Sequence, residues 1–162
     1  MSHVWGLPYR ASVREAALAN CYATHGTYLE DGSRFTGGHP SSVVIPAVFA
    51  QAEALRCSGA ELIASTVAGY EVFLRLGRDT YPENVGRGFQ PTAILAAVSS
   101  AAAVARLFGL SAEAAADALA IAANLGVGMK EALKSSTTQP LQVARGCEGG
   151  IVAALLARSG LH

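Results

Sequence analysis

Residues 88–105 read GFQPTAILAAVSSAAAVA, a stretch without a single charged side chain. Its length would allow a membrane-spanning helix, but Gln90, Pro91, two serines and many alanines dilute its apolar character. We therefore expect a helix over residues 92–108 that is buried at the centre of a helical protein. Gly109 follows it and is typical of the residue just beyond a helix end, where a left-handed backbone is common.

Helix start signals recur on both sides of this central segment. Ser12 with Glu15, and Ser58 with Glu61, have the spacing of a capping box, in which the serine accepts from a free backbone N–H and the glutamate reaches back. No run of residues shows the alternation of apolar and polar side chains that is typical of a solvated strand. The expected helices cover residues 12–24, 41–56, 58–77, 92–108, 112–124 and 140–159.

These patterns predict an all-α protein, an antiparallel helical array that forms a single domain over residues 1–162. Ser41 or Ser42 is expected to cap the second helix, with Pro46 near its first turn, where a missing N–H costs least. Ser111 is expected to cap the fifth helix. Because alanines leave little side-chain area on each helix, every helix needs several neighbours for stability.

The chain carries 12 basic and 12 acidic residues and is 51% apolar, with only 15% of its residues charged. A net charge of zero gives no basic surface for nucleic acid or an anionic membrane, so neither is an expected partner. So few charges cannot cover every face, which favours contact with another copy or another chain. Three cysteines without metal-binding spacing and an N-terminus without a signal-like apolar stretch favour a cytoplasmic protein with reduced, packed thiols.

Nearly all the unusual polar residues fall in three segments that we expect to be non-helical, residues 24–42, 78–92 and 130–145. Loops at one end of a helical array can meet, so one pocket built from all three segments is expected. No spacing of histidine, cysteine or carboxylate residues suggests a metal site. Motifs for nucleotide binding and for a nucleophilic serine are absent as well.

The first polar segment holds two carboxylates, a cation and an imidazole, namely Glu30, Asp31, Arg34 and His39. His39 comes directly before a proline and an expected helix start, where free N–H groups and the helix dipole attract anions. It could exchange a proton with a carboxylate-bearing substrate, or be an ordinary loop histidine near a solvated acid pair. His25 is at a helix exit and is expected to pack, or to interact with the helix dipole, rather than to catalyse.

The other two polar segments offer groups that can bind a carboxylate. Arg87 could hold an acidic substrate through its planar guanidinium, although surface arginines are common. Lys130 and Lys134 are one helical turn apart beside Glu131, a spacing typical of an exposed ion-pairing face. The hydroxyl-rich run before Gln139 precedes a helix start and suits anion binding.

Several stretches, in chain order, resemble the MmgE/PrpD family, which includes 2-methylcitrate dehydratase, cis-aconitate decarboxylase and iminodisuccinate epimerase. They are ASVREAALAN with THG (11–26), LEDGSRFTGGHPSSVVIPA (29–47), GAELIASTVAGYEVFLRLGR (59–78), RGFQPTAILAAVSSAAAVARLFGLSAEAAADALAIA (87–122) and TTQPLQVARGCEGGIVAALLARSGL (137–161). The likeness covers nearly the whole chain with natural spacing, and it is therefore specific.

The resemblance implies the helical domain of a homodimeric enzyme that uses no metal or other cofactor. Such an enzyme abstracts a proton next to a carboxylate and then eliminates, decarboxylates or epimerises a small polycarboxylate. His39 falls on the histidine of the family's HP[SG] motif, and Glu30 with Asp31 falls on the acidic pair of its loop. Tyr28 stands where the family loop usually begins with an acid.

Three glutamines also depart from the family pattern. Gln90 replaces the histidine of the GFHPT motif, and Gln139 and Gln142 replace the lysine and histidine of the TKPLH motif. Glutamine can hydrogen-bond a carboxylate but supplies neither charge nor a base, which argues against straightforward 2-methylcitrate dehydratase chemistry. The predicted catalytic groups are His39, Tyr28 and Asp31, and the predicted substrate-binding groups are Glu30, Arg34, Arg87, Gln90, Thr92, Lys134, Gln139 and Gln142.

The resemblance implies that members of the family are longer and carry a smaller α/β lid domain, which these 162 residues are not expected to include. We therefore hypothesise a subunit of a split lyase or isomerase, which acts by proton abstraction on a small carboxylate-bearing metabolite while a second chain supplies the lid. Two alternatives stay open. The chain could be a repurposed stand-alone cyclase or isomerase, or a non-catalytic helical module for binding or assembly.

Overall fold

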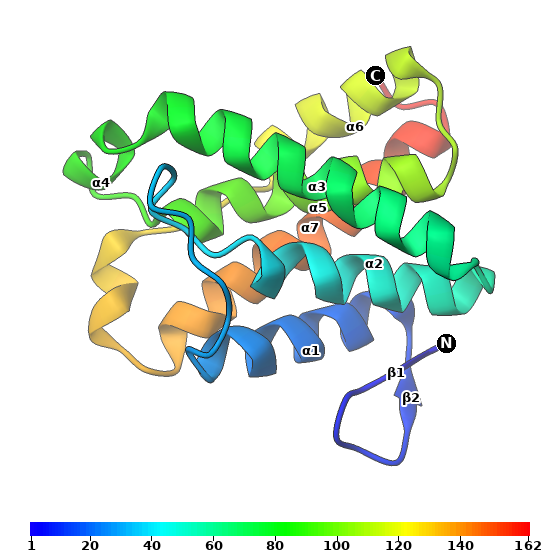
Figure 1. Cartoon of the computed structure of the whole chain (residues 1–162), viewed down its shortest axis with the longest axis horizontal. Coiled ribbons are helices and arrows are strands. Elements are labelled where there is room, and N and C mark those ends of the chain that lie inside the picture. The colour runs from blue at the N-terminus through cyan, green and yellow to red at the C-terminus, as the bar shows by residue number, and fades with distance from the viewer.

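The computed structural model describes all residues 1–162 and contains seven α-helices packed side by side (Figure 1). They are α1 (Val13–Gly26), α2 (Ser41–Leu55), α3 (Gly59–Thr80), α4 (Glu83–Gly86), α5 (Pro91–Leu107), α6 (Ala112–Ala123) and α7 (Thr138–Arg158). A 3-10 helix, η1, spans Lys130–Lys134, and strand β1 (Ser2–His3) pairs antiparallel with β2 (Arg10–Ala11). The predicted helical class is confirmed. The two strands were not expected, because two residues are too few to show strand alternation.

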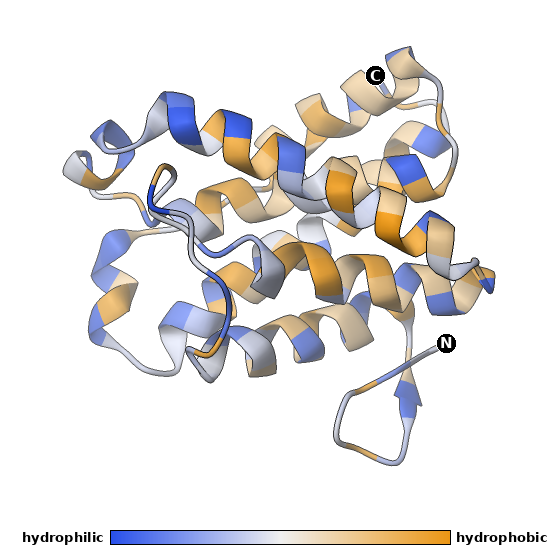
Figure 2. Cartoon of the chain, viewed as in Figure 1, coloured by the Kyte–Doolittle hydropathy of each residue, from blue (hydrophilic) through white to orange (hydrophobic).

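The charge-free segment forms the central helix α5, as predicted. This helix packs against α2, α3, α6 and α7, and Figure 2 shows apolar residues concentrated along α2 and α5. Glycines allow α7 to approach closely, since a methyl group at Gly150 would lie 2.5 Å from the carbonyl oxygen of Ala97. A methyl group at Gly146 would lie 2.6 Å from the Cβ of Ala96. At these two points α5 and α7 therefore pack with their backbones in near contact.

Three of the expected helix starts form as predicted. Ser12 and Ser58 each close a capping box with the glutamate three residues later, and the Ser111 side chain accepts from the N–H of Ala114. At the other end of α5, Gly109 has a φ of 65°, the left-handed conformation expected after a helix. Local sequence therefore determines these boundaries without help from distant residues.

Helix α2 begins differently from the prediction. Neither Ser41 nor Ser42 caps it with a side-chain hydrogen bond; instead, Asp31 Oδ1 accepts from the N–H of Ser41 at 2.9 Å. Pro46 is the sixth residue of the helix, inside it and beyond the first turn. The carboxylate of Asp31, ten residues before Ser41, thus caps α2 in place of a local serine. The residues next to the helix start do not reveal such a distant cap.

The polar segments also contain more helix than expected. Helix α1 continues to Gly26 and α3 to Thr80, and α4 interrupts the second segment. Helix α7 begins at Thr138 because the hydroxyl of Ser135 accepts from the Thr138 N–H at 3.2 Å. The third segment is therefore mostly helical; this agrees with the helix predicted from residue 140 and corrects the non-helical prediction for residues 130–139.

The three polar segments lie at one end of the helical array, and the N-terminal hairpin and both chain termini lie at the other (Figure 1). None of the helices combines the length and apolar character needed to cross a membrane. Cys21 and Cys147 are buried and Cys57 is partly buried, and all three are free thiols.

Candidate active site

A pocket of about 330 Å³ opens where the three polar segments meet. Each segment contributes to its wall, and the starts of α5 and α7 bring Gln90 and Gln139 into it. Its polar groups are Tyr28, His39, Gln90, Lys130 and Gln139, and its apolar wall includes Tyr81, Val85, Phe89 and Leu133. The structure thus gathers the expected segments around one site.

His39 is held so that one ring nitrogen faces the protein and the other is free. Nδ1 is 2.7 Å from the carbonyl oxygen of Asp31, an atom that can only accept, so Nδ1 carries the proton. The backbone N–H of His39 donates to Thr92 Oγ1 at 3.2 Å, which ties the loop to the start of α5. Nε2 makes no hydrogen bond within the chain, and the side chain is 38% exposed. A neutral His39 therefore offers an unprotonated nitrogen as a base.

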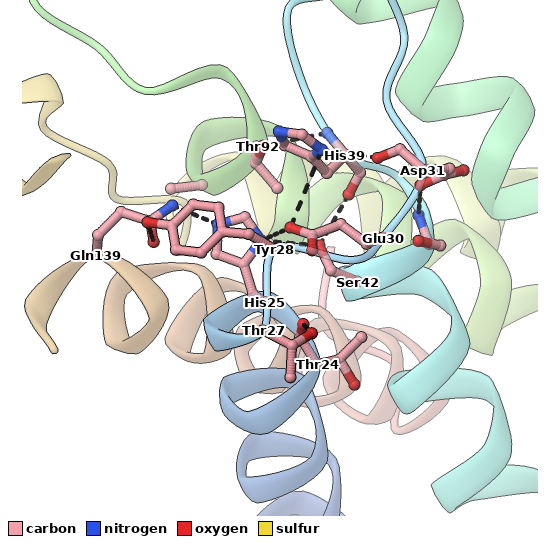
Figure 3. A network of polar contacts seen from close by, with 12 residues as sticks. Thr24, His25, Thr27, Tyr28, Glu30, Asp31, His39, Ser42, Thr92 and Gln139 are labelled. Carbon is pink, nitrogen blue, oxygen red and sulfur yellow. Dashed lines mark hydrogen bonds and ion pairs between the residues drawn. The ribbon is translucent and has the colours of Figure 1, made fainter. Parts of the chain in front are cut away.

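A chain of hydrogen bonds connects Tyr28 to the backbone of His39 (Figure 3). The Tyr28 hydroxyl donates to Gln139 Oε1 at 2.8 Å, and the Gln139 amide N–H donates to His25 Nε2. His25 Nδ1–H donates to Ser42 Oγ at 3.1 Å, and the Ser42 hydroxyl donates to the carbonyl oxygen of His39 at 2.9 Å. Only this direction of donation satisfies every group, so the chain fixes both the Gln139 amide and the His25 tautomer.

Tyr28 depends on this chain for its position. Its φ of 54° lies in the left-handed region that favours glycine, so the backbone at Tyr28 is strained. The bond to Gln139 holds the hydroxyl at the pocket wall in spite of that strain. Backbone strain of this kind is common at functional sites.

His25 must be neutral for the chain of hydrogen bonds to exist. Burial lowers the pKa of His25 below its ordinary value; the nearby Glu30 charge opposes this, and the nearby His39 adds to it. Protonation would place a hydrogen on the bare Nε2, where it would face the donating N–H of Gln139. The lowered pKa thus preserves the bare Nε2 that accepts from Gln139 at neutral pH.

Glu30 is a buried carboxylate between the two imidazoles. Its Oε1 is 2.8 Å from His25 Nδ1 and 3.9 Å from His39 Nδ1, and its side chain is 1% exposed. Despite these short distances, neither oxygen has a hydrogen bond of good geometry. The contact is therefore mainly electrostatic, and Glu30 acts on the rings from behind the pocket rather than on a substrate within it.

Asp31 does not reach the pocket, contrary to its predicted catalytic role. Oδ1 accepts from the N–H of Ser41, and Oδ2 accepts from the Tyr70 hydroxyl at 2.9 Å. Burial and the neighbouring Asp31 raise the pKa of Tyr70 well above its ordinary range, so Tyr70 stays a donor. The protein's own carboxylate thus occupies the start of α2, where the sequence suggested a substrate anion.

The predicted cations lie outside the pocket. Arg34 is exposed, and Arg87 faces a separate depression beside Asp79 and Glu83. Lys134 pairs with Glu131 at 2.5 Å on an exposed surface, in agreement with the ion-pairing interpretation of that spacing. Lys130, at the start of η1, lines the pocket in place of Lys134, which was predicted to bind substrate.

Two predicted polar residues support the site from outside it. Gln142 binds the backbone of Met129 twice, accepting from its N–H at 3.0 Å and donating to its carbonyl at 3.3 Å. Thr92 is buried and accepts from the His39 backbone. Both therefore position the loops, and neither lines the pocket.

His25, Ser42 and Lys130 are site residues that the sequence reasoning missed. His25 follows the buried Cys21 by four residues and so continues the apolar face of α1. A histidine on such a face needs polar partners, and this was the available signal. No three His, Cys, Asp or Glu side chains lie in a group that could hold a metal ion.

All of the chain, residues 1–162, matches the MmgE/PrpD N-terminal domain, and the protein therefore belongs to the MmgE/PrpD family. It is 35% identical to human cis-aconitate decarboxylase, over 99% of this chain and 34% of that protein. Mouse cis-aconitate decarboxylase is 32% identical over the same shares, and the Aspergillus terreus enzyme is 30% identical over 90% of this chain and 31% of its own length. The chain spans about a third of the length of these relatives.

Proposed function

We propose that this chain supplies the proton-transfer groups of a lyase or isomerase that acts on a small carboxylate-bearing metabolite. The arrangement of His39 supports this most directly, because its Nδ1–H is fixed on a backbone carbonyl and its Nε2 is free at a pocket. Removal of a proton next to a carboxylate requires such a base, and a histidine suits this work near neutral pH. The Tyr28 hydroxyl is a second proton-carrying group at the same wall.

The other pocket groups suit a carboxylate. Lys130 supplies a fixed positive charge, and the N-terminal ends of α5 and α7 add partial positive charge. Gln90 uses Oε1 to cap the N–H of Ala93 at 2.6 Å, while its amide nitrogen makes no hydrogen bond within the chain and can donate to a substrate. The relatives named for cis-aconitate, a carboxylate, agree with this substrate class.

We further propose that another polypeptide segment closes the pocket, and that a lid-bearing second chain supplies it. Two apolar side chains of the pocket wall and the ring of Tyr28 stay largely open to solvent: Phe89 is 41% exposed, Leu133 49% and Tyr28 56%. Such a rim is typical of a surface that another segment covers. Native mass spectrometry with lid-bearing partner chains should detect a hetero-oligomer. A homodimer indifferent to every partner would contradict the split arrangement and favour a stand-alone enzyme.

The proton-transfer role can be tested by hydrogen exchange into substrate. The chain, alone and with its partner, is incubated in D2O with cis-aconitate and other small di- and tricarboxylates, and deuterium incorporation and product formation are followed by NMR. His39→Gln should lower the rate by roughly a hundredfold or more, the usual contribution of a general base. His162→Gln, at the exposed C-terminus, is the matched control and should leave the rate unchanged. Equal rates for His39→Gln and the wild type would remove His39 from the mechanism.

A non-catalytic binding module is the second candidate function. It is favoured by Gln90 and Gln139, neutral residues in a pocket where Lys130 is the one lysine or arginine of the wall. This reading predicts carboxylate binding at the pocket without any exchange of substrate hydrogen, whether or not a partner chain is present. The same NMR experiment therefore separates the two functions.

A further inference from the structure

A second pocket, of about 400 Å³, lies between α1, α7 and the segment that follows α6. Its wall combines two arginines and a carboxylate with an apolar side. The charged residues are Arg14, Arg145 and Glu148, and the apolar ones are Leu125, Val127 and Val152. None of these residues lines the pocket around His39, so the two pockets can be occupied independently.

Glu148 holds the two arginines together at this pocket. Arg14 donates from Nη2 and Nε to Glu148 Oε1 at 2.6 and 3.1 Å, and Arg145 Nη1 donates to Oε2. The Glu148 side chain is only 9% exposed, whereas those of Arg14 and Arg145 are 53% and 57% exposed. One carboxylate therefore balances two guanidiniums, and the group keeps a net positive charge. Most of the N–H donors of the two guanidiniums are left without a protein partner.

The apolar side of the pocket is kept open by a glycine. A methyl group at Gly149 would lie 3.2 Å from the Cβ of Leu125, which is closer than side chains normally pack. Without that methyl group, the segment from Asn124 to Val127 approaches α7 while the space beside Val152 stays free. A purely polar ion would leave this apolar wall unused.

We propose that this pocket binds a small organic monoanion, a carboxylate joined to a short apolar body. The carboxylate bridges the free N–H donors of Arg14 and Arg145, since guanidinium and carboxylate match in geometry. One negative charge neutralises the excess charge of the arginine pair. The apolar body contacts Leu125, Val127 and Val152, and its burial adds to the affinity.

Hexanoate is a suitable probe, and inorganic phosphate is the comparison that lacks an apolar body. Each is titrated into the 15N-labelled chain, and amide shifts are followed by NMR. Hexanoate should shift the amides of Leu125 and Gly149 and should bind more tightly than phosphate. Phosphate binding as tightly as hexanoate, or hexanoate shifts confined to the His39 pocket, would overturn the proposal.

Arg145→Gln is the informative variant, because Arg145 and Glu148 lie on the same helix. The loss of the Arg145 guanidinium leaves the Arg14–Glu148 bond between α1 and α7 intact, and a thermal melt of the variant verifies the fold. Arg75→Gln is the matched control, since it removes one positive charge from an exposed pair with Glu71. Hexanoate should bind about tenfold more weakly to Arg145→Gln, as expected for a lost charge-assisted hydrogen bond, and about equally to Arg75→Gln. Equal weakening in both variants, or none in Arg145→Gln, would show that no specific site exists.

Discussion

The α5–α7 interface and the His39 pocket share two helices but are stabilised in opposite ways. At the interface, Gly150 lets the backbones approach until even a methyl group has no room. At the pocket, Gln139 and His25 hold the walls through directional hydrogen bonds between buried side chains. The interface tolerates no added volume, whereas the pocket tolerates no lost donor or acceptor. The close packing of α5 on α7 thus positions the helix ends on which a small polar network depends.

The largest loss of folding stability is expected from Gly150→Ala. The added methyl group would meet the carbonyl oxygen of Ala97 at 2.5 Å, and backbone cannot move aside as a flexible side chain can. We expect a loss of roughly 3 kcal/mol in the free energy of unfolding, as for severe overpacking, measured by urea denaturation.

Gly59→Ala is the matched control, because Gly59 is also helical and nothing lies within 4 Å of the added methyl group. It should be neutral or stabilising by up to about 1 kcal/mol, since alanine restricts the unfolded chain. Similar free energies of unfolding for the two variants would show that the helices are not in backbone contact.

A smaller effect is expected from Gln139→Met, which keeps the length of the side chain and removes its amide. The Tyr28 hydroxyl would lose its acceptor and buried His25 its donor. We expect a loss of about 2 kcal/mol, the usual cost of unpaired buried polar groups. In the proton-transfer assay the rate should fall as well, because Tyr28 is no longer held.

Gln142→Met is the matched control, and it tests whether loss of a glutamine amide lowers stability strongly only in the buried chain of hydrogen bonds. Gln142 is half-buried and binds only the Met129 backbone, which water can replace as a partner. Its loss should cost about 1 kcal/mol or less, because a solvated group is not left unpaired. If Gln142→Met lowered the free energy of unfolding as much as Gln139→Met, the buried chain of hydrogen bonds would contribute no more to stability than the exposed contact of Gln142.

The smallest effect is expected from mild acid acting through His25. Its pKa in the folded protein is below the ordinary value of 6.5. As the pH falls through 6.5, the unfolded chain therefore takes up a proton before the folded protein does, and the free energy of unfolding decreases. Above that pH, both states are neutral at His25 and no pH dependence arises from it.

Urea denaturation at a series of pH values checks this dependence. The wild type should lose stability between about pH 7 and pH 5, and His25→Gln should lose less over the same range. His162→Gln should follow the wild-type curve, since His162 is exposed. Parallel curves for His25→Gln and the wild type would exclude His25 as the source.

The fold could be predicted from the sequence because the signals that set most helix boundaries are local. The capping serines, the charge-free segment and Gly109 each act within a few residues, and the structure confirms them. The start of α2 was not accessible, because Asp31 reaches it from across a loop. Nothing in the spacing of neighbouring residues distinguishes such a distant cap from a serine cap.

The candidate site was predictable only in part, for a related reason. The three segments that form the pocket could be recognised by composition, and His39, Tyr28, Gln90 and Gln139 do line it. Which charged residues face the pocket depends on helix rotation, and η1 places Lys130 there in place of Lys134. The role of His25 depends on Ser42 of α2 and Gln139 of α7, and no single stretch of sequence contains both.

The most direct test concerns the protonation of His39 itself. Two-bond nitrogen–proton NMR spectra of the 15N-labelled chain at neutral pH report which ring nitrogen of each histidine carries the proton. Assignments come from His3→Gln and His162→Gln for the two histidines near the termini, and from His25→Gln for the third. We predict that the neutral ring of His39 carries its proton on Nδ1, which leaves Nε2 unprotonated at the pocket. A proton on Nε2 at that pH would contradict the proposed base, because the nitrogen that faces the substrate could not accept one.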